Sequence, residues 1–421
     1  MSLTTKVLVA LIAGAICGLA LNYAGLGTAG SWGFVYLVDG LFKVVGSLFV
    51  NALKMLVVPL VIFSLIPGIV GIGDLSLLGR VGIKAFLLYL MTTAIAIATA
   101  LAGASLFGIG KGMNIESTSS FDGREAPPLT QVFIDIIPSN PIAAMANGDM
   151  LAVIFFAIVF GISLLAVAKD SPDVIRFIEQ MNKVMMQMVT LVMRFAPYAV
   201  FCLIAKAVAT LGLSLLLQLK DYFLVLVAVL LLHGLVTLPI ILKLLTRLNP
   251  IIFIQKMRTA QLFAFSTASS AATIPVTMRT AQERLGVDRS IASFTVPLGA
   301  TINMDGTAMM QGVATVFIAN LYGIDLGLSG YLTVIAMSVL ASIGTAAVPG
   351  VGLIMLTMVF AQVGLPVEGI GLILGIDRIL DMVRTAVNVT GDAAVSSIVA
   401  NGEGKLERDI FADASAGTIK R

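Results

Sequence analysis

The chain has 421 residues, of which 58% are hydrophobic and only 12% are charged. Soluble domains carry roughly 25% charged residues, so this composition excludes an ordinary soluble domain. The long apolar runs favour helices over a barrel and predict an all-α polytopic membrane protein. A net charge of +3 is too small to indicate a nucleic-acid partner.

Six apolar segments precede residue 250, and we expect each to cross the membrane. They cover residues 5–23, 33–70, 82–108, 129–168, 185–215 and 221–246. Basic residues gather in alternate breaks, as at Arg80 and Lys84 and again at Lys243 and Arg247. The positive-inside rule then places the N-terminus in the cytoplasm. The polar tail after Asn401 is expected on the same side, with a solvated role.

Three hydroxyl side chains share one face of the third apolar segment. Tyr89, Thr92 and Thr93 have the spacing of neighbours on a helix. Hydroxyls in membrane helices bond back to their own backbone more often than they bind ions, and the spacing alone favours that interpretation.

Residues that could hold a transition metal are scarce. Cys17 and Cys202 lie far apart in apolar runs, which indicates neither a disulfide framework nor a metal site. The single histidine, His233, stands alone in LLLHGL and is more typical of a satisfied interior histidine than of a proton relay. No nucleophile–base pair stands out either, so the sequence does not predict an enzyme.

After residue 250, two apolar stretches are interrupted by tracts of small residues, STASSAAT (266–273) and SIGTAAVPGVG (342–352). Basic residues flank the first tract and are almost absent around the second, so we expect the segments to enter from opposite sides. Paired interrupted segments are typical of transporters built from inverted repeats. Small residues also permit close helix packing, and each tract alone fits either interpretation.

A helix break is predicted between these tracts, in PLGATINMDGTAMMQG (297–312). Pro297, Gly299 and Gly306 interrupt the helix, and Asn303 and Asp305 lie at the break. Freed carbonyls, amides and carboxylates are oxygen ligands that suit a hard cation such as Na⁺. The alternative is a structural kink whose aspartate pairs with a buried arginine.

A polar stripe runs along the last apolar segment. Asp381, Arg384, Thr385, Asn388 and Asp392 are spaced so that all lie on one helix face. The guanidinium suits a carboxylate and Asp381 suits an ammonium group, while Asn388 and Asp392 could complete a cation site. The alternative is an internal i,i+3 ion pair. The preceding pair, Asp377 and Arg378, is interpreted either as structural or as supporting the binding residues without touching a ligand.

Four ordered motifs carry a resemblance to a known family. They are STASSAATIPVTM (266–278), NMDGT (303–307), SIGTAAVPGVG (342–352) and ILDMVRTAVNVTGD (379–392). Together they resemble the glutamate transporter family, the dicarboxylate/amino acid:cation symporters. The similarity covers nearly the whole chain, and it is greatest to bacterial and archaeal members.

The resemblance implies eight membrane-spanning helices plus two re-entrant helical hairpins with inverted repeats, assembled as a homotrimer in the lipid bilayer. Residues 1–81 and 111–215 would form a scaffold. Residues 82–110 and 216–403 would form a transport domain that slides across the membrane like an elevator, with the second hairpin as its gate. Residues 404–421 would be a cytoplasmic tail.

The resemblance also assigns the binding residues. Arg384 would hold the side-chain carboxylate of the substrate, and Asp381 its α-ammonium group. The rest of the substrate site would come from Thr307, Thr385, Asn388, Gly352 and the backbone near Ser270 and Val348.

Three Na⁺ sites are implied in the same way. One would use Asp392 with carbonyls of Gly299, Asn303 and Asn388. A second would use carbonyls of Thr301, Ser342, Ile343 and Thr345 beside Met304. A third would use Tyr89, Thr92, Thr93, Asn303 and Asp305, and so favours ion binding for the hydroxyl patch.

Single residues narrow the expected activity. Having both Asp381 and Arg384 implies an acidic amino acid, because dicarboxylate carriers differ at the first position and neutral amino-acid carriers lack the arginine. Asp392 stands where proton-coupled bacterial members tend to carry Asn, which favours Na⁺. Gln311 replaces a Glu linked to proton cotransport in mammalian carriers.

Three positions depart from the relatives. Ala268 and Met382 stand where different relatives carry a second arginine, and Ala347 replaces a gate glycine.

We expect a symporter that imports L-aspartate or L-glutamate with Na⁺ in a bacterial-type inner membrane. A proton-coupled C4-dicarboxylate symporter and a substrate-gated anion channel are the alternatives.

Overall fold

The computed structural model describes residues 3–70, 78–112, 134, 137–345, 350–413 and 416. Within these residues every regular element is a helix, and strand pairing is limited to one isolated antiparallel bridge between Val287 and Leu406. The predicted all-α class is therefore confirmed.

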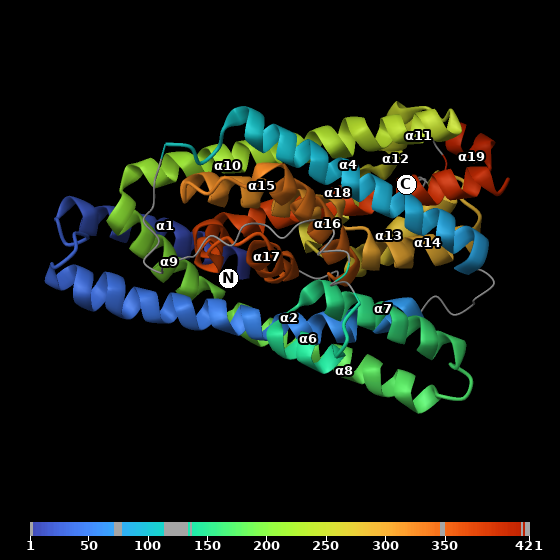
Figure 1. Ribbon diagram of the computed structural model, residues 1–421. Coiled ribbons are helices and arrows are strands. Elements are labelled where there is room, and N and C mark those ends of the chain that lie inside the picture. Colours follow the sequence, from blue (N-terminus) through green and yellow to red (C-terminus); the bar gives the residue numbers. More distant parts are fainter. Residues whose placement is uncertain are drawn as a thin grey trace.

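One group of helices comes from the N-terminal half of the chain. Its members are α1 (Leu3–Tyr23), η1 (Phe34–Phe42), α2 (Lys43–Val70), α6 (Pro141–Asn147), α7 (Met150–Ala166), α8 (Pro172–Arg194) and α9 (Ala196–Leu211). Helix α1 packs along α9, and α2 packs along α7 and α8. Helices α2, α6, α7 and α8 lie along one side of the molecule (Figure 1).

The second group surrounds the long helix α18 (Ile370–Gly402). Its other members are η2 (Leu78–Gly82), α4 (Ile83–Phe107), α10 (Leu213–Leu232), η3 (His233–Thr237), α11 (Leu238–Thr246), α12 (Pro250–Thr267), α13 (Ser270–Arg279), η4 (Thr280–Arg284), α14 (Arg289–Ile302), α15 (Asp305–Leu321), α16 (Gly327–Gly344), α17 (Val351–Gln362), η5 (Val367–Gly369) and α19 (Arg408–Ala412). Helices α4, α10, α12, α14 and α15 all pack against α18. In Figure 1, α4, α10 and α11 run along the side opposite α2 and α8.

By length and composition, two helical stretches among the described residues could cross a membrane, Arg80–Phe107 and Leu215–Thr246. A third would be the pair α8 and α9, if the 48° bend between them lies within one span. The all-helical membrane class is consistent with this result, but the expected number of eight spans is not established by it.

Both interrupted tracts end one helix and begin another. Helix α12 ends at Thr267, and α13 begins at Ser270, whose neighbour Ser269 accepts a hydrogen bond from the Ala272 amide. The turn requires a left-handed backbone at Ala268, with φ of 49°. The two helices pack against each other, as do α16 and α17. Residues 346–349, which include Ala347, lie outside the described residues.

The predicted break at Asn303 and Asp305 is confirmed. Helix α14 contains Pro297 and ends at Ile302, and α15 begins at Asp305. Asn303 is extended, so the first backbone amides of α15 have no carbonyl partner in a preceding helical turn, and that of Gly306 bonds Asn388 of α18 instead. Helix α15 also packs along α4, which brings the hydroxyl patch to the same place.

The segment after α18 folds back, although its polar composition predicts a solvated tail. The Glu407 amide donates to Gly286 O at 2.8 Å, and the Asp288 amide donates to Lys405 O at 3.1 Å. Phe411 is buried, and the Lys256 ammonium lies 5.6 Å from the centre of its ring. Apolar burial and backbone pairing therefore hold residues 404–413 against η4 and α12.

Candidate substrate- and cation-binding site

The predicted polar stripe is buried along α18. The side chains of Asp381, Arg384, Thr385, Asn388 and Asp392 are all at most 7% exposed. The start of α15 lies directly on this helix, because a Cβ at Gly306 would be 2.6 Å from Arg384 O. The Gly306 amide donates to Asn388 Oδ1 at 2.7 Å. A side chain of the stripe therefore caps the broken helix, as the short polar residues at helix starts do.

Arg384 is fully buried between two carboxylates. Its Nη1 lies 2.8 Å from Asp377 Oδ1, and its Nη2 donates to Asp381 Oδ1 at 2.9 Å. Arg378 lies 3.5 Å from the other oxygen of Asp381. The i,i+3 ion pair considered from the sequence is therefore present, and it is joined by Asp377. Arg384 Nε has no hydrogen-bond partner among the described residues.

The start of α17 approaches this cluster. The Gly350 amide donates to Asp381 Oδ2 at 3.2 Å. A Cβ at Gly352 would be 2.9 Å from Thr307 Cγ2 and 3.6 Å from Arg384 Nη2. Three predicted substrate residues, Gly352, Thr307 and Arg384, are thus brought together. Any larger side chain at position 352 would occupy the space in front of the guanidinium.

The other predicted substrate residues differ in their surroundings. Thr385 Oγ1 donates to Asp381 O on its own helix, at 2.7 Å. Ser270 begins α13 and is buried, but no contact described for it joins it to Arg384. Val348 lies outside the described residues.

The predicted third ion site forms a connected cluster around Asp305. Thr93 Oγ1 donates to Asp305 Oδ1 at 2.7 Å, and Thr92 Oγ1 lies 3.3 Å from the same oxygen. Thr92 is also 3.5 Å from Asn303 Oδ1. Tyr89 is different, because its hydroxyl donates to Thr295 O at 2.8 Å. The cluster offers hydroxyl, amide and carboxylate oxygens, the ligand types that suit a hard cation.

Asp392 lies beside this cluster. Its Oδ1 accepts a hydrogen bond from Asn303 Nδ2 at 3.0 Å. A Cβ at Gly299 would be 2.5 Å from that same oxygen and 2.7 Å from the Tyr89 hydroxyl. The residues predicted for the first ion site, Asp392, Asn303 and Gly299, are therefore neighbours, with Asn303 shared between the two sites.

The residues of the predicted second ion site converge where α14 and α16 end. Ser342 Oγ lies 3.2 Å from Ile302 O, which joins the two helix ends. Met304 Sδ is 3.7 Å from Asn388 Nδ2. Thr301 and Thr345 use their hydroxyls within their own helices, on Pro297 O and Ala341 O. Ile343 is buried in the last turn of α16.

Two contacts were not expected from the sequence. Asp377 reaches Arg384, although i,i+7 spacing on one helix face could have indicated it. His233 lies on Asp305, with 3.1 Å between Nε2 and Oδ2. Nothing in the sequence signals this second contact, because the two residues come from different helices 72 positions apart.

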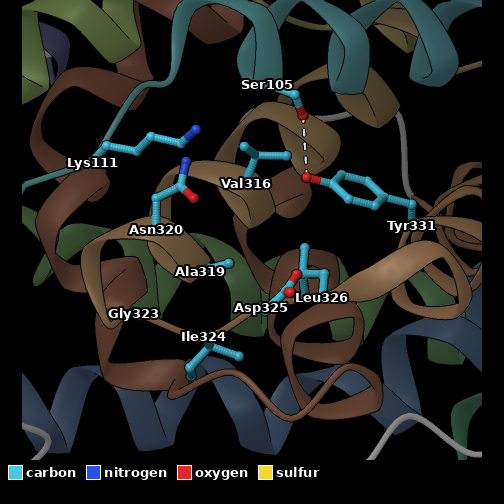
Figure 2. A pocket seen from close by; sticks show the side chains of 10 residues that line it. All are labelled: Ser105, Lys111, Val316, Ala319, Asn320, Gly323, Ile324, Asp325, Leu326 and Tyr331. Carbon is cyan, nitrogen blue, oxygen red and sulfur yellow. Dashed lines mark hydrogen bonds between the residues drawn. The ribbon is translucent and has the colours of Figure 1, made fainter.

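A cavity of about 350 Å³ lies elsewhere, between the end of α4 and the loop from α15 to α16. Figure 2 shows Lys111, Asn320 and Asp325 around it, with the hydrogen bond between Ser105 and Tyr331 at its edge. None of the predicted substrate or ion residues that the structure describes lines it. It is therefore separate from the site on α18.

Comparison with known proteins identifies the family. The chain is 35% identical over 374 residues to the "Proton/sodium-glutamate symport protein" of Bacillus caldotenax, which covers 87% of this chain and 88% of the relative. It is 35% identical over 419 residues to the "Proton/glutamate-aspartate symporter" of Escherichia coli (strain K12), covering 97% and 94%. It is 34% identical over 402 residues to the "Excitatory amino acid transporter" of Caenorhabditis elegans, covering 84% and 80%.

The profile of the sodium:dicarboxylate symporter family matches residues 3–401. The match spans the broken helix, both interrupted tracts and all of α18 except its last residue, Gly402. The protein is accordingly a transporter and not an enzyme, and it belongs to the sodium:dicarboxylate symporter family.

Proposed function

We propose that the protein is a secondary symporter that imports L-aspartate or L-glutamate coupled to Na⁺. The observation that carries this proposal is the fully buried Arg384 beside Asp381, facing the start of α17. A buried guanidinium paired with carboxylates can exchange one of them for a ligand carboxylate without losing its charge balance. The substrate side chain would replace Asp377 on Arg384, and the substrate ammonium group would bind Asp381.

The α-carboxylate of the substrate would lie near helix N-termini. Helix α13 begins at Ser270, and α17 begins at Val351. Free amides and the positive end of the helix dipole attract anions at such places. Thr307, Thr385, Asn388 and Gly352 would complete the site, together with the backbone near Val348.

The coupling ion would be Na⁺ at three sites. Asp305 and Asp392 are buried among neutral oxygen-bearing groups, so a cation would relieve the cost of two buried carboxylates. The Bacillus relative is named for protons and sodium, and the Escherichia coli relative for protons. A proton is therefore the alternative ion. An aspartate at position 392 favours Na⁺, since proton-coupled relatives of the resembled type tend to carry Asn.

The movement would be an elevator displacement of the α18 group against the N-terminal group, within a homotrimer. This division is supported by packing: most contacts of α18 are with its own group, and near its start Gly371 and Gly375 meet side chains of α1 and α9. The α12–α13 and α16–α17 pairs would be inverted re-entrant hairpins, the second acting as the gate. Eight further helices would span the membrane.

The protein would lie in a bacterial inner membrane with both termini in the cytoplasm. Arg80 and Lys84 pair with Glu403 at the end of α18. Lys256 donates to Ile410 O in the segment after α18, and Arg284 bonds the backbone of Lys256. This concentration of basic residues fits the cytoplasmic side under the positive-inside rule.

Uptake of radiolabelled L-aspartate into proteoliposomes tests the proposal. An inward Na⁺ gradient and an inward proton gradient are compared at matched voltage. Uptake that requires Na⁺ and is competed by glutamate but not succinate would support it. Uptake driven by protons alone, with strong succinate competition, would favour a proton-coupled C4-dicarboxylate symporter. Substrate-gated current without concentrative uptake would indicate an anion channel.

A further inference from the structure

His233 is the only histidine of the chain, and it is completely buried. It opens the π-helical turn η3 between α10 and α11. Within this turn His233 and Gly234 face inward, while the flanking Leu232 and Leu235 are 46% and 44% exposed. A π turn is a local widening that is frequent at functional sites. Here it places an imidazole inside the bundle, directly on the Asp305 cluster.

The two oxygens of Asp305 have different partners. Oδ1 lies with the hydroxyls of Thr93 and Thr92, at 2.7 and 3.3 Å. Oδ2 faces His233 Nε2 at 3.1 Å. The backbone of α18 is close on this side as well, because a Cβ at Gly391 would be 3.2 Å from Oδ2. One oxygen is thus held by the imidazole, and the other is turned toward the ligand oxygens of the third ion site.

The hydrogen-bond roles follow from the partners. A carboxylate only accepts, so the imidazole donates from Nε2. Nδ1 has no partner among the described residues. We assign no proton to it, because a buried N–H without an acceptor would carry a larger desolvation cost. The neutral ring with its proton on Nε2 satisfies both conditions, and this tautomer is assigned from the network.

We propose that His233 is a positioning residue for the third Na⁺ site. Its Nε2–H holds Oδ2 of Asp305, and this hydrogen bond aims Oδ1 at an ion bound together with Thr92 and Thr93. The inference rests on the proposed Na⁺ coupling and adds to it a residue that does not touch the ion. Residues that hydrogen-bond to a metal-coordinating side chain orient that side chain, and their loss typically lowers metal affinity by about 10- to 100-fold.

The test uses the full-length protein with His233→Leu, His233→Gln and His233→Asn. The amide nitrogen of Gln can extend about as far as Nε2, whereas that of Asn corresponds to Nδ1 and falls short of Asp305. Two readouts are compared: the half-saturating Na⁺ concentration for L-aspartate uptake, and the Na⁺ concentration that half-maximally raises the thermal midpoint without amino acid. Thr315→Val is the matched control, because Thr315 is equally buried but bonds only Gln311 O of its own helix.

We expect His233→Leu and His233→Asn to raise the half-saturating Na⁺ about tenfold or more in both readouts. His233→Gln and Thr315→Val should stay near the wild type, and the aspartate KM at saturating Na⁺ should change little in every variant. If His233→Leu does not fold, the half-saturating Na⁺ concentrations of the Gln and Asn variants test the proposal. A higher value for Asn than for Gln supports it, and equal values contradict it.

Two results would overturn the role of His233 while leaving Na⁺ coupling intact. One is an unchanged Na⁺ response in both the Leu and Asn variants. The other is a shifted pH profile of uptake with an unchanged Na⁺ response, which would indicate proton transfer by the imidazole. A wild-type protein that responds to Na⁺ in neither readout would overturn the coupling itself, and this proposal with it.

Discussion

The two polar clusters along α18 differ in their balance of charge. Around Arg384, two carboxylates, Asp377 and Asp381, face two guanidinium groups, those of Arg384 and Arg378. Around Asp305 and Asp392, the hydrogen-bond partners among the described residues are hydroxyls, an amide and one imidazole, with no lysine or arginine among them. Buried charges are costly unless paired, so the first cluster is complete by itself and the second is short of a cation.

Because of this difference in charge balance, the two clusters suit different ligands. A balanced cluster can accept an acidic amino acid by exchange, because the incoming ion pairs replace internal ones. An unbalanced cluster favours the uptake of positive charge. Since both lie on one helix and meet at the broken start of α15, ligands at one cluster should change affinity at the other, and linkage requires the effect to be reciprocal.

The largest effect is expected from breaking the balanced cluster. Arg384→Ala should lower kcat/KM for aspartate by about 100-fold or more, because truncating one partner of a buried charge pair costs about 2–5 kcal/mol. Uptake kinetics measure this, with the thermal midpoint as a check on folding. Arg378→Ala is the comparison variant and should have a smaller effect, because its guanidinium is partly exposed and lies 3.5 Å from Asp381, farther than the 2.9 Å of Arg384. Equal aspartate uptake by Arg384→Ala would refute the role of the guanidinium.

Removing a carboxylate from the unbalanced cluster tests whether that cluster binds a cation. Asp392→Asn should raise the half-saturating Na⁺ at least about tenfold, equivalent to ~1.4 kcal/mol of ion binding. Without Na⁺, the variant should melt higher than the wild type, because one of two neighbouring buried carboxylates is gone. A Na⁺ titration of the thermal midpoint and of uptake reads both effects. An unchanged titration would count against Asp392 as an ion ligand.

The balance around Arg384 can also be shifted without removing the guanidinium. Asp377→Asn should lower the aspartate KM several-fold at saturating Na⁺, because the substrate carboxylate no longer competes with an internal one for Nη1. Competition uptake assays would measure this change. A raised KM would show that Asp377 supports the site and does not compete for it.

The smallest effect is expected just past the C-terminal end of α18, where Glu403 pairs with Lys84 and with Arg80, the latter at 2.6 Å. The hydrogen bond from Lys84, helped by the charge of Arg80, lowers the pKa of Glu403. A lowered pKa in the folded state stabilises it above the unfolded pKa of about 4.3, and this stabilisation is lost as the pH falls through the folded value.

Glu403→Gln should therefore lower the thermal midpoint slightly at neutral pH, with the difference from wild type disappearing in acid and shrinking in high salt. Melting curves at several pH values would show it. A difference that persists in acid would mean that packing, and not charge, holds this end of α18.

Helical spacing predicted the stripe on α18 and the break at Asn303, since both depend on residues close in sequence. The i,i+7 spacing of Asp377 and Arg384 could have indicated their contact, but spacing does not show whether an acid on the same face pairs with the arginine. The contact of His233 with Asp305 depends on how α10 packs against α15, and one sequence contains no signal for that. The packing of Phe411 was missed because an isolated apolar residue in a polar tail is weak evidence.

Thermal unfolding of the purified wild-type protein tests the contrast between the two clusters most directly. The midpoint is measured with Na⁺ alone, with L-aspartate alone in choline, and with both. We expect stabilisation by Na⁺ alone, little by aspartate alone, and more than the sum when both are present. Equal stabilisation by aspartate with and without Na⁺ would contradict it, because the two clusters would then bind their ligands independently.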